Sequence, residues 1–395
     1  MKGSTAMATT PTKIGILGCG VISGIYIETA QKVDAIEIGA IADVNPESAK
    51  FRAEQYGIER VLTPEQLMAD PEIEIIVSLT PNRLHGQIGA QIIEAGKSLY
   101  SEKPFAVYRE EALANVAAAE AKGLRTGGAP DTFFGAAWQT ARKAIDDGLI
   151  GQPYAAFSYL AGRWAPPPPG APLPQWMIDA QTRPTRKVEP GHVSFFSVDG
   201  GKYGVSNTFD MGGYYLTNLI NLLGPAKSVM GMTNKMFDEV VRGDRTIKVE
   251  SPTHVTGIIQ FQSGVLCQWL TSSDVFGTGL PHIEIYGTEG SLRCSDPNNF
   301  PGKVYLRKPD SQELIELETK HAIVQDTRGI GVADMAVAIK NGRPHRANGR
   351  MTSHVVDIMN ALHESSDQSK KVDLVTTCEQ PKALPVDLPN WTIDD

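Results

Sequence analysis

The segment FDMGGYYL at residues 209–216 places one carboxylate, two glycines and two phenols within a short distance along the chain. Tyr214 and Tyr215 point about 100° apart on the helix expected there, so only one of them can face a cleft. Tyr215, Leu219 and Leu222 share an apolar stripe, which predicts that this tyrosine packs inward. Tyr214 is then free to exchange a proton, with Asp210 orienting either the phenol or its substrate. The alternative is a structural tyrosine beside a helix-capping aspartate.

A second stretch, GCGVIS at residues 18–23, follows an apolar run and opens a helical one. Such a turn directs backbone N–H groups at a pyrophosphate, so Gly18, Gly20, Val21 and Ile22 are predicted to bind a cofactor. Asp43 ends the next strand-like run, where a carboxylate accepts hydrogen bonds from an adenosine ribose. Together these features predict a bound dinucleotide rather than a tight turn without a ligand. Because the carboxylate would repel a 2′-phosphate, we expect NAD rather than NADP.

Strand-like and helical patterns alternate between residues 13 and 130. This alternation predicts an α/β fold with a doubly wound parallel sheet, a Rossmann domain over 13–130, after a disordered or tag-like segment at 1–12. TPNRLH at 80–85 and EKP at 102–104 each follow a predicted strand, although either could be an ordinary strand end. Ligands bind at the carboxyl ends of such strands, so Lys103 is placed to polarise a substrate oxygen and to lower the pKa of a nearby phenol.

Residues 131–395 have a different pattern and are predicted to form a substrate-binding and oligomerisation domain. Alternating apolar runs there predict a large, mostly antiparallel open sheet; they lie at 153–162, 226–237, 253–264, 265–273, 282–294 and 303–308. A proline-rich run at 165–176 predicts an extended loop. Two helical segments near the end, at 329–342 and 351–367, are expected to form a polar tail.

The chain of 395 residues has a net charge of -8, and its Lys and Arg residues are scattered, so no nucleic-acid partner is expected. The N-terminal residues lack the apolar stretch of a signal peptide and no apolar run is long enough to span a membrane, which predicts a soluble, cytoplasmic protein. Its four cysteines, Cys19, Cys267, Cys294 and Cys378, lack metal-ligand spacing. We expect them to be reduced core residues, and no metal site is predicted.

GCGVIS, TPNRLH, EKP and DMGGY occur in this order along the chain. From Lys13 onward the sequence resembles the Gfo/Idh/MocA family, named after glucose-fructose oxidoreductase, inositol dehydrogenase and a rhizopine catabolism protein. The resemblance implies that four residues line the nicotinamide side of the cleft: Thr80, Pro81, Asn82 and His85. It also implies that Glu102 and Lys103 bind the cofactor, with Lys103 at the junction between nicotinamide and substrate.

The chain departs from the commonest family pattern at two positions. Where that pattern has a histidine, followed three residues later by an aspartate, this sequence has Tyr214 and Thr217. A tyrosine at the first position is similar to the glucose-fructose oxidoreductase and dimeric dihydrodiol dehydrogenase branches. It favours retained acid-base chemistry and argues against inositol dehydrogenation.

The resemblance implies an NAD-dependent oxidoreductase that transfers a hydride between the nicotinamide and a hydroxyl of a sugar, glycoside or polyol. One alternative is a hydrolase or lyase that holds NAD tightly and oxidises its substrate transiently, and another is a non-catalytic sensor of cofactor or metabolite. Arg163, Trp164 and His192 are the candidate substrate-binding residues, because they flank the proline-rich loop. An open sheet with one face free of helices favours packing against another subunit, and the resemblance implies a homodimer or homotetramer.

Overall fold

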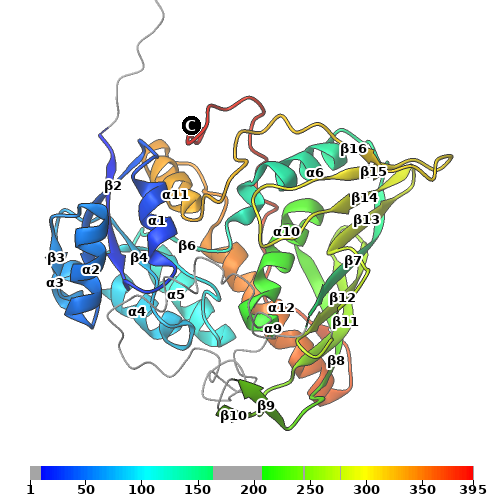
Figure 1. Ribbon diagram of the computed structural model, residues 1–395, viewed down its shortest axis with the longest axis horizontal. Coiled ribbons are helices and arrows are strands. Elements are labelled where there is room, and N and C mark those ends of the chain that lie inside the picture. The colour runs from blue at the N-terminus through cyan, green and yellow to red at the C-terminus, as the bar shows by residue number, and fades with distance from the viewer. Residues whose placement is uncertain (1–9, 163–206, 243–244, 276, 395) are drawn as a thin grey trace, which may run out of the picture.

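The computed structural model describes residues 10–162, 207–242, 245–275 and 277–394 (Figure 1). Six parallel strands form its first sheet, in the order β3-β2-β1-β4-β5-β6. They are β1 (Thr12–Leu17), β2 (Ile36–Ala42), β3 (Val61–Leu62), β4 (Ile75–Ser78), β5 (Ser98–Ser101) and β6 (Thr126–Gly128). The predicted Rossmann sheet is therefore confirmed, and the pairing of β1 with β4 is the point where the strand order reverses and ligands bind in such sheets.

Helices connect these strands: α1 (Ser23–Ala30), α2 (Pro46–Tyr56), α3 (Pro64–Ala69), the 3-10 turn η1 (Asn82–Leu84), α4 (His85–Glu94) and α5 (Arg109–Ala121). Local sequence fixes where α2 begins and ends. The Asn45 side chain accepts the backbone N–H of Glu47, and Gly57 ends the helix with a φ of 67° that favours glycine. Only three residues, 43–45, separate β2 from α2, so Asp43 lies at the carboxyl end of β2.

The second sheet has nine strands, in the order β16-β15-β14-β13-β7-β12-β11-β8-β17. Its strands are β7 (Pro153–Ala161), β8 (Ala226–Asn234), β11 (His254–Phe261), β12 (Leu266–Ser272), β13 (Ile283–Gly287), β14 (Gly290–Cys294), β15 (Tyr305–Arg307), β16 (Ile315–Glu316) and β17 (Val372–Asp373). The predicted runs correspond to β7, β8 and β11 to β15, while β9 (Glu239–Arg242) and β10 (Arg245–Lys248) form a separate hairpin. All neighbours pair antiparallel except β7 and β12, so the sheet is mixed but mostly antiparallel.

One face of this sheet is covered by helices, whereas Figure 1 shows no helix outside the other face among the residues described. The elements of this part are η2 (Thr132–Phe134), α6 (Ala136–Asp146), α9 (Asn207–Asp210), α10 (Gly212–Leu223), α11 (Ile330–Asn341) and α12 (Gly349–Gln368). α6 packs on β14, α10 on β7 and α12 on β8. Large apolar side chains stay exposed on strands of the open face, including Met230, Met232, Ile258 and Leu266.

The prediction of a polar C-terminal tail is wrong, because α11 and most of α12 are buried. α12 lies between β8 and α5, and its polar residues find partners there. Asp357, for example, forms an ion pair of 2.6 Å with Arg109 of α5 and also accepts the hydroxyl hydrogen bond of Thr376. α11 returns to the first sheet and packs beside α1, as Figure 1 shows. Polar residues of these helices, such as Asp357, therefore have partners on other elements in the interior rather than facing water.

Candidate active site

The predicted site residues of the first sheet gather at the carboxyl ends of its strands. Gly18 follows β1, Asp43 follows β2, Thr80 follows β4, and Glu102 and Lys103 follow β5. Parallel strands end at one edge, so four sequence segments that are far apart meet there.

The glycine turn after β1 has the geometry that its sequence predicts. Gly18 has a φ of 104°, and a Cβ at this position would lie 2.6 Å from the carbonyl oxygen of Leu79. A Cβ at Gly20, in contrast, would meet no atom within 4 Å, so the space above the turn is open. α1 begins just beyond with Ile22 at its N-cap and no side-chain cap. An uncapped helix start beside open space fits the pyrophosphate of a dinucleotide.

The side chains of Asp43 and Arg52 form hydrogen bonds with the backbone of this turn. The two carboxylate oxygens of Asp43 accept backbone N–H groups from Cys19, at 2.8 Å, and Asn45, at 2.7 Å. Arg52 is buried and donates to the carbonyl oxygens of Gly20 and Val21, at 3.2 and 3.3 Å. Sequence reasoning missed Arg52, because nothing in its helix marks an arginine that turns inward.

His85 supports the neighbouring loops rather than facing an open cleft. It is 1% exposed, and its ring nitrogens lie 2.7 Å from the carbonyl oxygens of Pro104 and Thr80. Burial lowers the pKa of its ring, which these two carbonyl groups partly offset. The resemblance implies that His85 lies on the nicotinamide side, which stays a prediction, and in the structure this side chain joins the loops after β4 and β5. Next to Thr80, Pro81 is exposed and Asn82 begins η1.

Glu102 connects α1 with the loop after β5 that carries Lys103. Its carboxylate accepts the hydroxyl hydrogen bond of Tyr26, on α1, at 2.9 Å and the backbone N–H of Lys103 at 2.8 Å. Glu102 is 7% exposed, so these contacts fix the start of the EKP segment in the interior. Tyr26 is a further residue that the sequence did not indicate.

Lys103 and Asp210 form an ion pair between the two parts of the chain, although they are 107 residues apart. The Lys103 Nζ atom donates to the Asp210 carboxylate at 2.6 Å and to its backbone carbonyl at 2.8 Å. Burial alone would lower the pKa of Lys103, but Asp210, Tyr214 and Glu102 raise it above its ordinary value. The Lys103 side chain is therefore protonated at neutral pH. Asp210 does not cap α10, whose N-cap is Met211 without a side-chain bond.

Both tyrosines of the DMGGYY segment are buried, and their partners distinguish them. Tyr215 is 1% exposed and its hydroxyl lies 2.7 Å from Nδ1 of His282, so it packs inward as the apolar stripe predicts. Tyr214 is 5% exposed and its ring centroid lies 5.4 Å from Nζ of Lys103. Burial raises the pKa of the Tyr214 phenol, and the nearby Lys103 only partly opposes this. The expected lowering by lysine is thus present but is outweighed by desolvation.

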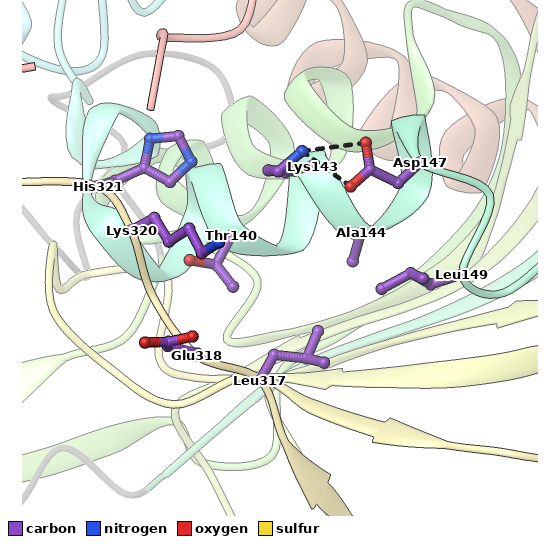
Figure 2. Close-up of a pocket in the computed structure, with 9 residues that line it drawn as sticks. All are labelled: Thr140, Lys143, Ala144, Asp147, Leu149, Leu317, Glu318, Lys320 and His321. Atoms are coloured by element: carbon purple, nitrogen blue, oxygen red, sulfur yellow. Dashed lines mark hydrogen bonds and ion pairs between the residues drawn. The ribbon is translucent and has the colours of Figure 1, made fainter. Parts of the chain in front are cut away.

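A small hollow next to this group is lined by Lys103, Phe209, Thr217 and Met359, among others. Thr217, at the position of the usual family aspartate, thus faces a mostly apolar space. A second hollow lies between α6 and the segment after β16, where Lys143 pairs with Asp147; it contains none of the predicted site residues (Figure 2). The three candidate substrate residues, Arg163, Trp164 and His192, lie outside the residues that the structure describes.

Within the described ranges, no group of three or more His, Cys, Asp or Glu side chains could hold a metal ion. The four cysteines are free thiols and buried. No helix in the described part of the chain is long and apolar enough to cross a bilayer. The cytoplasmic location stays a prediction.

A Rossmann sheet with a glycine turn and an acidic residue after β2, joined to a second α/β part that supplies Asp210 and Tyr214, defines an NAD-binding oxidoreductase. Two family models match the chain. Residues 12–127 match the model described as an oxidoreductase family with an NAD-binding Rossmann fold, and residues 196–293 match the GFO/IDH/MocA C-terminal domain. The chain belongs to the Gfo/Idh/MocA family of oxidoreductases, and its cofactor is NAD.

Two of the relatives have names that refer to small carbohydrates. The chain is 26% identical over 309 residues to 1,5-anhydro-D-fructose reductase of Ensifer adhaerens, a match that covers 77% of this chain and 82% of the reductase. It is also 26% identical to levoglucosan dehydrogenase of Pseudarthrobacter phenanthrenivorans, over 64% of this chain and 63% of that enzyme. The structure of a levoglucosan dehydrogenase with NADH and L-sorbose has a similar fold, with a TM-score of 0.75 at 21% identity, covering 93% of this chain and 100% of the other.

Proposed function

We propose that this protein is an NAD-dependent dehydrogenase that oxidises a hydroxyl group of a sugar, glycoside or polyol to a carbonyl group, with Lys103 and Tyr214 as its acid-base pair. The observation that carries the proposal is the approach of Lys103 to Asp210 and to the Tyr214 ring, at 2.6 and 5.4 Å, at the carboxyl edge of the Rossmann sheet. Carbohydrate substrates are supported by the names of the relatives.

The residues of the first sheet bind and orient the cofactor. The turn at Gly18–Gly20 and the start of α1 receive the pyrophosphate, and Asp43 accepts hydrogen bonds from the adenosine ribose. Bound NAD supplies the hydride acceptor. Through Tyr26 and the backbone N–H of Lys103, Glu102 sets the position of the lysine relative to α1.

Lys103 and Tyr214 handle the charge and the proton of the substrate hydroxyl. When the C–H electron pair leaves with its hydrogen as hydride, the O–H proton passes to the Tyr214 oxygen, which acts here in its deprotonated form, and a C=O bond forms. Because burial raises the pKa of this phenol, alcohol oxidation is expected to become faster as the pH rises. Lys103 stays protonated and stabilises the developing oxyanion, while Asp210 holds its ammonium group in place. In the reverse direction the phenol returns the proton. The mostly apolar lining around Lys103 strengthens these charge interactions, because charges attract more strongly where the local dielectric constant is low.

Purified protein with NAD and a panel of monosaccharides, glycosides and polyols tests the proposal through the absorbance of NADH. We expect net NADH formation with at least one compound. If NAD binds but no compound yields NADH, the dehydrogenase proposal is wrong. Release of an aglycone without net NADH would instead favour the hydrolase or lyase alternative.

We further propose that the open face of the nine-stranded sheet pairs with a second copy of this chain, in a dimer or tetramer. Met230 and Met232 on β8, and Ile258 on β11, are 56%, 72% and 39% exposed on neighbouring strands. Monomeric proteins rarely expose a continuous apolar patch of this kind. Burying it against an identical face would give a symmetric, self-complementary interface.

A further inference from the structure

A second cation lies beside Tyr214, on a segment that is distant in sequence from the rest of the site. The Arg328 guanidinium carbon is 5.9 Å from the centroid of the Tyr214 ring, and the Arg328 side chain is only 13% exposed. Lys103 Nζ is 5.4 Å from the same centroid. One buried phenol is therefore in contact with two permanent cations, one from each part of the chain.

The Arg328 side chain is held in this position from several directions. Its Nη2 atom donates to the backbone carbonyl and the side-chain oxygen of Asn298, at 2.8 and 2.7 Å, and Nη1 donates to Asp326. Burial would lower the pKa of Arg328, but the neighbouring Tyr214 and Asp326 raise it above its ordinary value. The guanidinium is thus fixed and always charged, and the interaction with the phenol is one of the reasons.

The backbone that carries Arg328 is fixed by Asp131. One carboxylate oxygen of Asp131 accepts the N–H groups of Gly329 and Gly331, at 2.9 and 3.0 Å, where α11 begins. Gly329 has a φ of 97°, and a Cβ there would lie 2.9 Å from the ring of Tyr26. A turn with this conformation and this close approach requires glycine at position 329, immediately after the arginine.

Four charged groups act on the Tyr214 phenol from the elements packed around it. Burial raises its pKa most, Lys103 and Arg328 lower it, and Glu102 and Asp210 raise it. Since both acidic groups oppose Lys103 and one of them is its ion-pair partner, Lys103 alone gives limited net stabilisation of a phenolate. Arg328 supplies the additional positive charge.

We propose that Arg328 is a positioning residue for proton transfer, which together with Lys103 holds the Tyr214 ring where its oxygen, in the deprotonated form, can take the proton of a substrate hydroxyl and return it. The inference rests on the proposed function, because it assumes that Tyr214 is the proton acceptor. Arg328 acts through Tyr214 and does not contact the substrate.

The ionisation of Tyr214 can be measured without turnover. Protein containing 3-fluorotyrosine is titrated by ¹⁹F NMR, with the Tyr214 resonance identified by its absence in Tyr214→Phe. An opposite charge within about 4–6 Å lowers a pKa by about 1–3. We therefore expect Arg328→Gln to raise the midpoint for this tyrosine by about 1–2 pH units. Arg328→Lys, which keeps the cation and its pairing with Asp326, should give a smaller increase.

Arg142→Gln is the matched control. Arg142 is 11% exposed and also holds α10 by a side-chain bond, through Nη1 to the carbonyl oxygen of Asn221 at 2.7 Å. Asn221 lies two turns along α10 from Tyr214. Replacing Arg142 therefore tests whether the loss of any arginine that contacts α10 has the same effect on Tyr214. A midpoint that moves no further in Arg328→Gln than in Arg142→Gln would overturn the inference.

The pH dependence of kcat supplies the second readout. In Arg328→Gln the ascending limb of the kcat profile for alcohol oxidation should move to higher pH by the same amount as the NMR midpoint, and kcat should approach the wild-type value above that limb. A shifted midpoint with an unshifted kcat profile would show that Arg328 does not position the proton acceptor. If wild type oxidises no compound of the panel, the proposed function fails, whereas the titration alone still decides whether Arg328 controls Tyr214.

Discussion

Replacing Tyr214 with phenylalanine removes one oxygen from the proposed proton acceptor and leaves the buried ring in place. A positioned acid-base group contributes about 10²- to 10⁴-fold to a rate, which corresponds to about 3 to 5 kcal/mol of activation free energy. We expect kcat to fall by at least about 10²-fold and the NAD dissociation constant to stay nearly unchanged, because the phenol acts on the substrate rather than on the pyrophosphate. The limb on which kcat for oxidation rises with pH should disappear as well.

Tyr215→Phe is the neighbouring control and should give the opposite result. Its hydroxyl lies 2.7 Å from Nδ1 of His282, and its ring packs edge-on against Trp269 with centroids 6.4 Å apart. Losing this partly buried hydrogen bond should lower the free energy of unfolding by about 1 kcal/mol. Its kcat should remain close to that of wild type, since Tyr215 is directed away from Lys103.

Both variants are measured by steady-state NADH formation over a range of pH, by fluorescence titration with NAD, and by denaturant unfolding. The reasoning is refuted if Tyr214→Phe keeps the wild-type kcat and pH profile while Tyr215→Phe loses activity. In that case the wrong ring of the pair has been chosen. A large loss of stability in Tyr214→Phe would also contradict the proposed role, because it would indicate that the phenol is mainly structural.

Lys103→Met should lower kcat by about 10²- to 10³-fold while NAD still binds in a fluorescence titration, and turnover within a few-fold of wild type would contradict its role. Asp43→Asn should narrow the preference for NAD over NADP in kcat/KM; a wild type that uses NADP equally well would refute the argument from charge. Burial lowers the pKa of His354 from 6.5 to about 4, while its Nε2 accepts the N–H of Ala226. Because the pKa of His354 is lower in the folded protein than in the unfolded chain, the unfolded chain binds the proton more readily. The free energy of unfolding should therefore fall by about 3 kcal/mol as the pH falls from 6.5 to about 4, at 1.36 kcal/mol per pH unit. Urea unfolding at several pH values should show a loss that is smaller in His354→Gln than in wild type by about this amount, and equal losses would exclude His354 as a cause. Met232→Lys should shift the protein toward a monomer in light scattering, and an unchanged assembly would exclude this face.

Local sequence was sufficient for the elements that bind the cofactor. The turn at Gly18, the carboxylate after β2 and the alternation of strands and helices each depend on backbone preferences within a few residues. The same holds for the strand ends at Thr80 and Lys103, because strands that run parallel must finish at a common edge. Local patterns failed for α11 and α12, whose polar residues resemble those of exposed helices.

The partners of each side chain were decided by tertiary structure. α10 is buried on all sides, so an apolar stripe could place Tyr215 but could not show which charges surround Tyr214. The ion pair of Lys103 with Asp210 joins the loop after β5 to α9, and Arg328 reaches Tyr214 from the turn before α11. The sequence by itself determined the fold class, the cofactor turn and the candidate residues at strand ends, because short-range backbone geometry has a local signature. Which cations face the phenol depends on how distant segments pack, and that packing leaves no signature near Arg328 in the chain.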